Sequence, residues 1–187
     1  VIAPATTSGM DKILKLVRKQ YAKDTDFEMP AMLEFKSSAQ DYDTLNFVYV
    51  FNDEGTDVTL VVNHNYELVS ITNPAVQDDA IAIAKTKKIK NFISSIEGNT
   101  ITIKSDGINE TSDITSTAVL NDDNEIVSFT SDISQQTPAY VDDKNFGPVY
   151  DAIINNGSLP AVSGATVTRD GIWAARNVLY AYLEVLN

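Results

Sequence analysis

The sequence contains no cysteine and one histidine among its 187 residues. The lack of cysteine excludes disulfides, thiolate catalysis and cysteine-ligated metal sites. The single histidine, His64, excludes a multi-histidine metal site, and it lies in the turn-like stretch NHNYE, in a different half of the chain from the candidate motif described below. A Ser-His-Asp arrangement is therefore not expected. We predict no metal site and no set of catalytic side chains.

Basic residues and long apolar runs are also scarce. The balance of 14 Lys and Arg against 26 Asp and Glu gives a net charge of −12, which excludes nucleic-acid binding driven by phosphate neutralisation. No apolar run approaches the roughly 18 residues of a membrane-spanning helix. The first residue is Val1 rather than Met, which fits the removal of a signal or lipid anchor and fits a shortened recombinant chain equally.

The composition, 43% hydrophobic and 21% charged, is typical of a globular protein. Helical periodicity predicts helices at four places: Met10–Ala22, Asp78–Ile96, Gly147–Asn155 and Asp170–Leu186. Strand-like runs lie between them, at Ala31–Phe35, Leu45–Phe51, Val58–Val62, Leu68–Ile71, Thr100–Lys104, Ile114–Leu120 and Glu125–Phe129.

Two stretches match one another without a gap. VVNHNYELVSIT (Val61–Thr72) and VLNDDNEIVSFT (Val119–Thr130) share Val, Asn, Glu, Val, Ser and Thr at equivalent positions. Each is typical of a strand, a polar turn and a second strand, although hairpins of this composition also converge. We interpret the match as a duplication and predict an α+β fold of two related halves, each an antiparallel sheet with flanking helices. The halves would comprise residues 1–97 and 98–187.

The stretch AVSGATVTRDGIW, from Ala161 to Trp173, combines small and hydroxyl residues before a predicted helix. Gly164 tolerates unusual backbone conformations, and Ala165 leaves the path to the backbone clear. Thr166 offers a hydroxyl, which we expect to be exposed in a cleft at the helix start with Gly164 beside it. Thr168 is expected to cap the helix. Helix-start amides and the helix dipole favour a phosphate group. A capped turn without a ligand is the alternative that these residues leave open.

The segment SGATVTRDGIWAARNVLYAYL resembles the signature of bacterial FMN-binding domains with covalently attached flavin. Such domains occur in electron-carrier subunits of the sodium-pumping quinone reductase and of the Rnf complex. The resemblance covers roughly residues 100–187. It implies that Thr166 is joined to the FMN phosphate by an extracytoplasmic flavin transferase, which uses FAD and magnesium. By the same resemblance, Ser163, Gly164, Ala165 and Thr168 match the flanking pattern.

The family also has a Glu-Thr-Pro element near the flavin, and here Gln136, Thr137 and Pro138 stand in its place. Pro160 occupies a position where the family usually has Asp, three residues before the Ser. Binding without a covalent bond, or a fold kept without flavin, therefore stays open beside covalent loading. Among nearby residues, Trp173 is expected either to contact the flavin or to pack in the core. Arg169 is expected either to reach the phosphate or to lie on the surface.

The resemblance implies an extracytoplasmic electron-transfer flavoprotein domain. It would act as an electron carrier rather than a stand-alone enzyme, because the flavin supplies the redox chemistry. Its partners would be a redox partner protein or a membrane electron-transfer complex, together with the flavin transferase. The chain would be anchored to a membrane through a segment absent from this sequence. The alternatives are a flavin-dependent reductase of a small acceptor and a non-redox interaction module without flavin.

Overall fold

The computed structural model describes residues 33–109, 112–137 and 143–187. The described chain divides into two compact units, which are considered separately below. The second unit comprises Gln40–Asn46 and Lys88–Asn187. The longer of these two segments begins at Lys88, ahead of the boundary expected after Glu97, because the strand that contains Glu97 pairs within the second sheet. The helix predicted over Met10–Ala22 lies outside the described residues.

The first unit is built on a four-stranded antiparallel sheet in the order β1-β2-β3-β4. Its strands are β1 (Leu33–Gln40), β2 (Phe47–Asp53), β3 (Thr56–Val62) and β4 (Leu68–Ile71). Three buried aromatic residues of β2 pair with three buried aliphatic residues of β3: Phe47 with Val62, Tyr49 with Leu60 and Phe51 with Val58. The short helix η1 (Pro74–Val76) leads into α2 (Gln77–Thr86), which buries Ala80 and Ala84.

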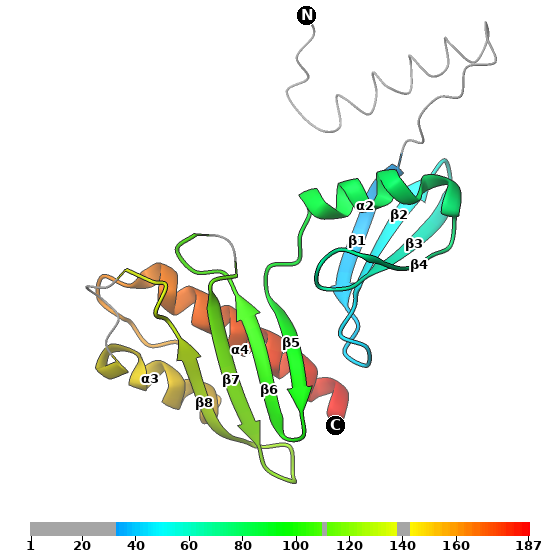
Figure 1. Ribbon diagram of the computed structural model, residues 1–187. Coiled ribbons are helices and arrows are strands. Elements are labelled where there is room, and N and C mark those ends of the chain that lie inside the picture. The colour runs from blue at the N-terminus through cyan, green and yellow to red at the C-terminus, as the bar shows by residue number, and fades with distance from the viewer. Residues whose placement is uncertain (1–32, 110–111, 138–142) are drawn as a thin grey trace, which may run out of the picture. The chain divides into compact units, whose positions relative to one another are not determined.

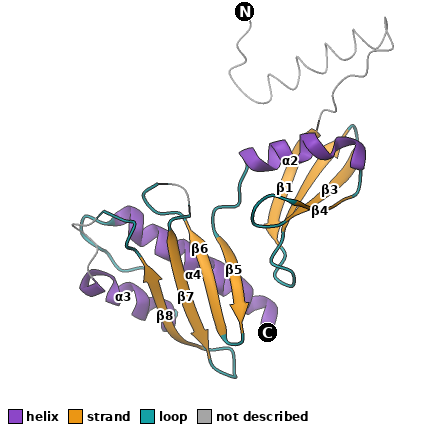
Figure 2. Cartoon of the chain, viewed as in Figure 1, coloured by secondary structure: helices purple, strands orange, loops and turns teal. Residues whose placement is uncertain are grey.

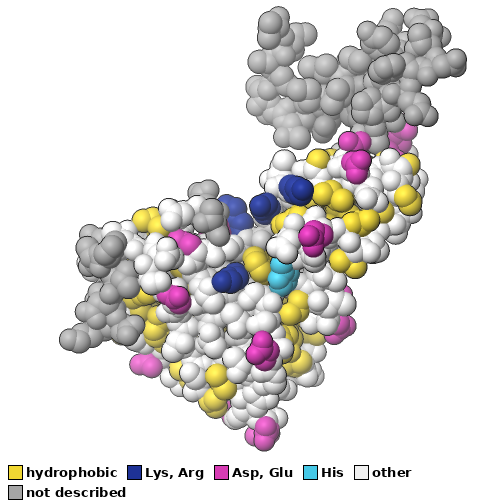
Figure 3. Space-filling view, in the orientation of Figure 1, with side chains coloured by type: hydrophobic (Ala, Val, Ile, Leu, Met, Phe, Trp, Pro, Cys, Tyr) yellow, Lys and Arg dark blue, Asp and Glu magenta, His cyan; other side chains and the backbone are white. Residues whose placement is uncertain are grey.

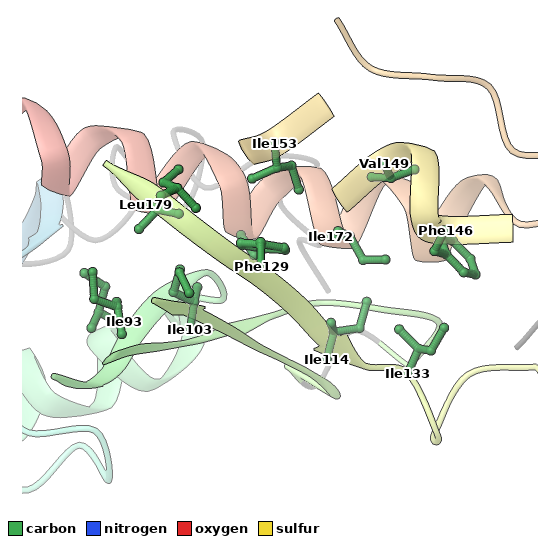
Figure 4. Packing of buried hydrophobic residues seen from close by; sticks show 14 of the residues in the cluster. Ile93, Ile103, Ile114, Phe129, Ile133, Phe146, Val149, Ile153, Ile172 and Leu179 are labelled. Atoms are coloured by element: carbon green, nitrogen blue, oxygen red, sulfur yellow. The ribbon is translucent and has the colours of Figure 1, made fainter. Parts of the chain in front are cut away.

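The second unit repeats this plan with the order β5-β6-β7-β8. Its elements are β5 (Phe92–Glu97), β6 (Thr100–Ser105), β7 (Ile114–Leu120), β8 (Ile126–Asp132), α3 (Asp143–Ile154) and α4 (Thr166–Leu186). Both helices pack on one face of the sheet (Figures 1 and 2). Figure 4 shows Ile172 and Leu179 of α4 and Ile153 of α3 pointing toward Ile103 and Phe129 of the sheet. Burial of these apolar side chains holds the unit together.

The two halves share the detailed geometry of their matching hairpins. In both, the strand register shifts at the same point, between Val61 and Val62 and between Val119 and Leu120. In both turns the asparagine side chain accepts two backbone amides. Asn63 accepts from Asn65 and Glu67, and Asn121 accepts from Asp123 and Glu125, at 2.8–3.0 Å.

The residue before each glutamate has a left-handed backbone conformation, with φ of 61° at Tyr66 and 62° at Asn124. Because these hairpins are the third and fourth strands of their sheets, the prediction of two related α+β halves is confirmed.

The prediction of a single helix over Asp78–Ile96 was wrong in its second part. Helix α2 ends at Thr86, and Phe92–Glu97 is strand β5 instead. Of Lys85, Lys87, Lys88 and Lys90, only Lys85 lies in the last turn of α2. Pairing with β6 places Ile93 in the core, fully buried. Long-range sheet pairing thus overrides a helical pattern that extends along the chain.

Two helix starts also differ from the sequence prediction. Helix α4 begins at Thr166 rather than Asp170, because the turn at Gly164 ends immediately before it. This first turn consists of the β-branched residues Thr166, Val167 and Thr168. Because such residues have a low helix propensity, the sequence pattern did not predict it as helix. Helix α3 begins at Asp143, ahead of the predicted Gly147, and contains Pro148.

The surface carries the excess of acid that the composition implies. On the face seen in Figure 3, the acidic side chains lie singly rather than in one patch. Within residues 33–109, 112–137 and 143–187, no helix has both the length and the apolar character that crossing a membrane requires.

Candidate functional site

A pocket of about 270 Å³ lies at the start of α4. It is lined by seven residues from three segments: Ile108, Thr137, Gly164, Ala165, Thr166, Val167 and Thr168. Thr166 is exposed and Gly164 precedes it in the same wall, as the sequence predicts. Ser163 is exposed in the turn just before them and does not line the pocket. Four of the five residues of the SGATVT motif that matched the family pattern therefore meet at one concavity.

The start of α4 leaves backbone donors without side-chain caps. The N-cap residue is Ala165, whose methyl group offers no acceptor, and the first helical hydrogen bond runs from Arg169 N to Ala165 O at 3.0 Å. The amides of the first turn, at Thr166, Val167 and Thr168, precede any helical carbonyl partner. These donors and the helix dipole make this end of the pocket favourable for an anion.

Gly164 is needed for the turn that presents this helix. Its φ is +74°, in the left-handed region where a side chain is unfavourable. Ala165 then points its methyl group into the core, with 6% of its surface exposed. The chain is thereby anchored immediately before Thr166, whose side chain faces outward.

The prediction that Thr168 caps the helix was wrong. Thr168 lies in the first turn, is 7% exposed, and donates a hydrogen bond from Oγ1 to Gln136 Oε1 at 2.9 Å. The helix begins earlier than predicted, which turns this hydroxyl inward instead of along the helix axis. Thr168 therefore joins α4 to the Gln136–Thr137 segment.

Gln136 is buried, with 3% of its surface exposed, and its carboxamide contacts three segments. Oε1 accepts from Thr168 Oγ1 and from Ile108 N at 3.2 Å, and Nε2 donates to Asp113 Oδ2 at 2.8 Å. Thr137, next in sequence, is exposed and lines the pocket. The structure thus brings the QT pair and the SGATVT motif together, and Pro138 lies outside the described residues.

The β6–β7 loop, which carries Ile108, is fixed at its start. Asp106 Oδ1 accepts from Ser112 N at 2.8 Å, and its Oδ2 lies 3.3 Å from Lys90 Nζ. Gly171 of α4 lies against the carbonyl of Asp106 so closely that a Cβ atom there would overlap it. A glycine in α4 therefore allows the loop to approach the helix and form one side of the pocket.

The two candidate flavin contacts predicted beyond the motif do not line the pocket. Trp173 is partly buried against the core, and the Arg176 guanidinium lies 5.1 Å from its ring centroid. Arg169 forms an ion pair of 2.8 Å with Asp170. The seven lining residues therefore include no charged side chain and no aromatic ring.

Sequence reasoning missed the apolar rim of the pocket. Ile108 and Val167 are large hydrophobic residues that are 47% and 56% exposed, and both line it. An isolated isoleucine in the polar stretch SDGINETSD was the available signal for Ile108. Asp113 was missed as well, because nothing local links it to Gln136.

The described residues contain no cluster of three or more His, Cys, Asp or Glu side chains placed to hold a metal ion. Comparisons with protein-family models, with curated proteins and with solved structures found no match to this chain. The resemblance to FMN-binding domains therefore stays a prediction from the motif.

Proposed function

We propose that the second unit is an extracytoplasmic electron-transfer domain that carries FMN on Thr166. The observation that carries the proposal is the exposed residue Thr166 on the wall of a pocket, at the start of a helix whose N-cap residue makes no side-chain cap hydrogen bond. A modifying enzyme needs a protruding hydroxyl, and the free amides of the first turn then stabilise the attached phosphate.

The size and lining of the pocket fit a tethered flavin. A volume of about 270 Å³ is just below the roughly 300–1,000 Å³ of most ligand pockets, so the pocket would enclose only part of an FMN group, such as its phosphate. Ile108 and Val167, which line the pocket and are exposed, would offer apolar surface to the flavin ring. A covalent bond to Thr166 removes the need for full enclosure, since the ligand does not dissociate.

When bound, the flavin would supply the electron transfer, and the protein would supply attachment, orientation and surroundings. Loading would join Thr166 Oγ to the phosphorus of the FMN half of FAD, release AMP and pass the hydroxyl proton to the transferase. The partners would be that transferase and a redox protein or membrane electron-transfer complex.

The test is co-expression with a flavin transferase and FAD, followed by intact-mass analysis. We expect one FMN-sized increment in the wild type, its loss in Thr166→Val and partial retention in Thr166→Ser. Thr137→Val is the matched control, because Thr137 is also an exposed pocket threonine and should still load. An increment that persists in Thr166→Val, or that maps to Ser163 or Thr168, would overturn the assignment.

Pro160 favours a second candidate function, a non-redox interaction module that keeps the fold without flavin. Since this proline replaces an acid that the resembling domains usually have, Pro160→Asp should raise the loaded fraction if the missing acid limits modification. If neither the wild type nor this variant loads, and protein from the native host lacks flavin absorbance, the non-redox module is the better description.

A further inference from the structure

Both ends of the Gln136 carboxamide are hydrogen-bonded inside the protein. Its oxygen accepts the Thr168 hydroxyl and the Ile108 amide, and its nitrogen donates to Asp113 Oδ2. With 3% of its surface exposed, Gln136 has little contact with water to replace a lost bond. As long as residue 113 is a carboxylate, the group in this position must therefore be an acceptor at one end and a donor at the other.

Asp113 makes the donor end necessary. Its Oδ1 is buried without a hydrogen-bond partner in the part of the chain that the structure describes. Among those residues, the bond that its carboxylate receives comes from Gln136 Nε2. A carboxylate at position 136 would face this carboxylate at hydrogen-bond distance, and two unshared like charges there are unfavourable.

The β6–β7 loop passes directly over the pair. A Cβ atom at Gly107 would overlap Asp113 Oδ1 and Gln136 Nε2, so the backbone of this residue lies against both groups. The next residue, Ile108, binds Gln136 through its amide and exposes its side chain on the pocket rim. A shift of the pair would therefore move the loop wall of the pocket.

We propose that Gln136 and Asp113 form a carboxamide–carboxylate pair that positions two walls of the pocket, one through Ile108 and the other through Thr168. Gln136 is a positioning residue in this arrangement and not a ligand contact. The amide at position 136 and the acid at position 113 are matched to each other, so that exchanging the two groups preserves every hydrogen bond.

The exchange of the two groups is the test. NMR measures the rate of hydrogen exchange at the Ile108 amide in three variants: Gln136→Glu, Asp113→Asn and the double variant. Gln136→Glu should increase the hydrogen-exchange rate of the Ile108 amide by about tenfold or more. Repulsion between the two carboxylates would displace the side chain of residue 136, whose oxygen accepts the hydrogen bond of this amide. Asp113→Asn alone should stay within about twofold, since an amide can turn its oxygen toward Gln136 Nε2. The double variant should regain the wild-type rate.

Flavin loading at Thr166 gives a second readout, which rests on the proposed function. It should fall in Gln136→Glu and return in the double variant. If the wild type takes no flavin, the proposed function fails and the Ile108 exchange still decides the pairing. Wild-type exchange in Gln136→Glu, or no recovery in the double variant, would overturn the pairing. If Gln136→Glu does not fold, folding of the double variant is the deciding observation, and its failure to fold also overturns the pairing.

Discussion

The Thr168 hydroxyl donates to Gln136 Oε1 at 2.9 Å across a sequence separation of 32 residues. Two threonines of one motif thereby have opposite surroundings, because Thr168 is 7% exposed whereas Thr166 is exposed on the pocket wall. The inner hydroxyl joins two segments of the fold, and the outer one is the attachment point that we propose for the flavin. This division allows stability and flavin loading to be tested separately.

Thr168→Val should lower the free energy of unfolding by about 1–2 kcal/mol, because it leaves Gln136 Oε1 short of a donor in a buried site. Thr166→Val should change it by less than about 0.5 kcal/mol, as is usual for an exposed position. Urea denaturation of the two variants measures the difference. Equal losses in both would show that the Thr168–Gln136 bond contributes nothing particular to stability.

Gly171→Ala should destabilise the second unit by about 2 kcal/mol, although alanine is the better helix former. The added methyl would overlap the Asp106 carbonyl and lie 2.7 Å from Ile114 Cδ1. Gly147→Ala is the control, because it lies in α3 and a Cβ there meets nothing within 4 Å. That control should be neutral or stabilising by up to about 1 kcal/mol. Thermal unfolding compares the two, and a neutral Gly171→Ala would contradict the close approach.

Asn63→Ala and Asn121→Ala should cost nearly equal amounts, about 1–2 kcal/mol each. Each asparagine accepts two backbone amides and donates to a glutamate, at 2.7 Å to Glu67 and 2.9 Å to Glu125. Hydrogen exchange of the amides that follow each asparagine measures the loss within its own hairpin. Asp122→Ala, in the same turn and exposed, should leave exchange unchanged. Clearly unequal costs would mean that the two turns have diverged energetically.

The first unit should lose a small part of its stability in acid through Asp57. The Lys36 ammonium, at 2.9 and 3.0 Å, and then the Asn52 amide lower the pKa of this carboxyl. Because the folded-state pKa is below the unfolded one, the contribution is present above about pH 4 and is lost as pH falls through the folded-state pKa.

Asp57→Asn should therefore be less stable than the wild type at pH 7, and the gap should close toward pH 2. The side chains of Lys36 and Asp57 are 47% and 55% exposed. Because salt screens an exposed ion pair, 1 M salt should also reduce the stability difference at pH 7. Urea midpoints at the two pH values measure it. A gap that is independent of pH would exclude this ion pair as its source.

Local pattern was enough to predict several parts of this protein. Strand β4 and strand β7 have the predicted bounds, and the two Asn-to-Glu turns follow from the matched sequences. A hairpin is formed by residues that are neighbours in the chain, so the local sequence determines the hydrogen bonds of its turn. The exposure of Thr166 beside Gly164 is local in the same sense, because the glycine turn and the helix start adjoin.

Only the tertiary structure decided which elements meet. Phe92–Glu97 became a strand because β6 was available to pair with it, and its own helical pattern carried no information on that partner. Gln136 meets Thr168, Ile108 and Asp113 because the sheet and α4 bring distant segments together. The donor and acceptor at each end of one buried amide must be satisfied in space, and separation along the chain does not indicate which groups will satisfy them.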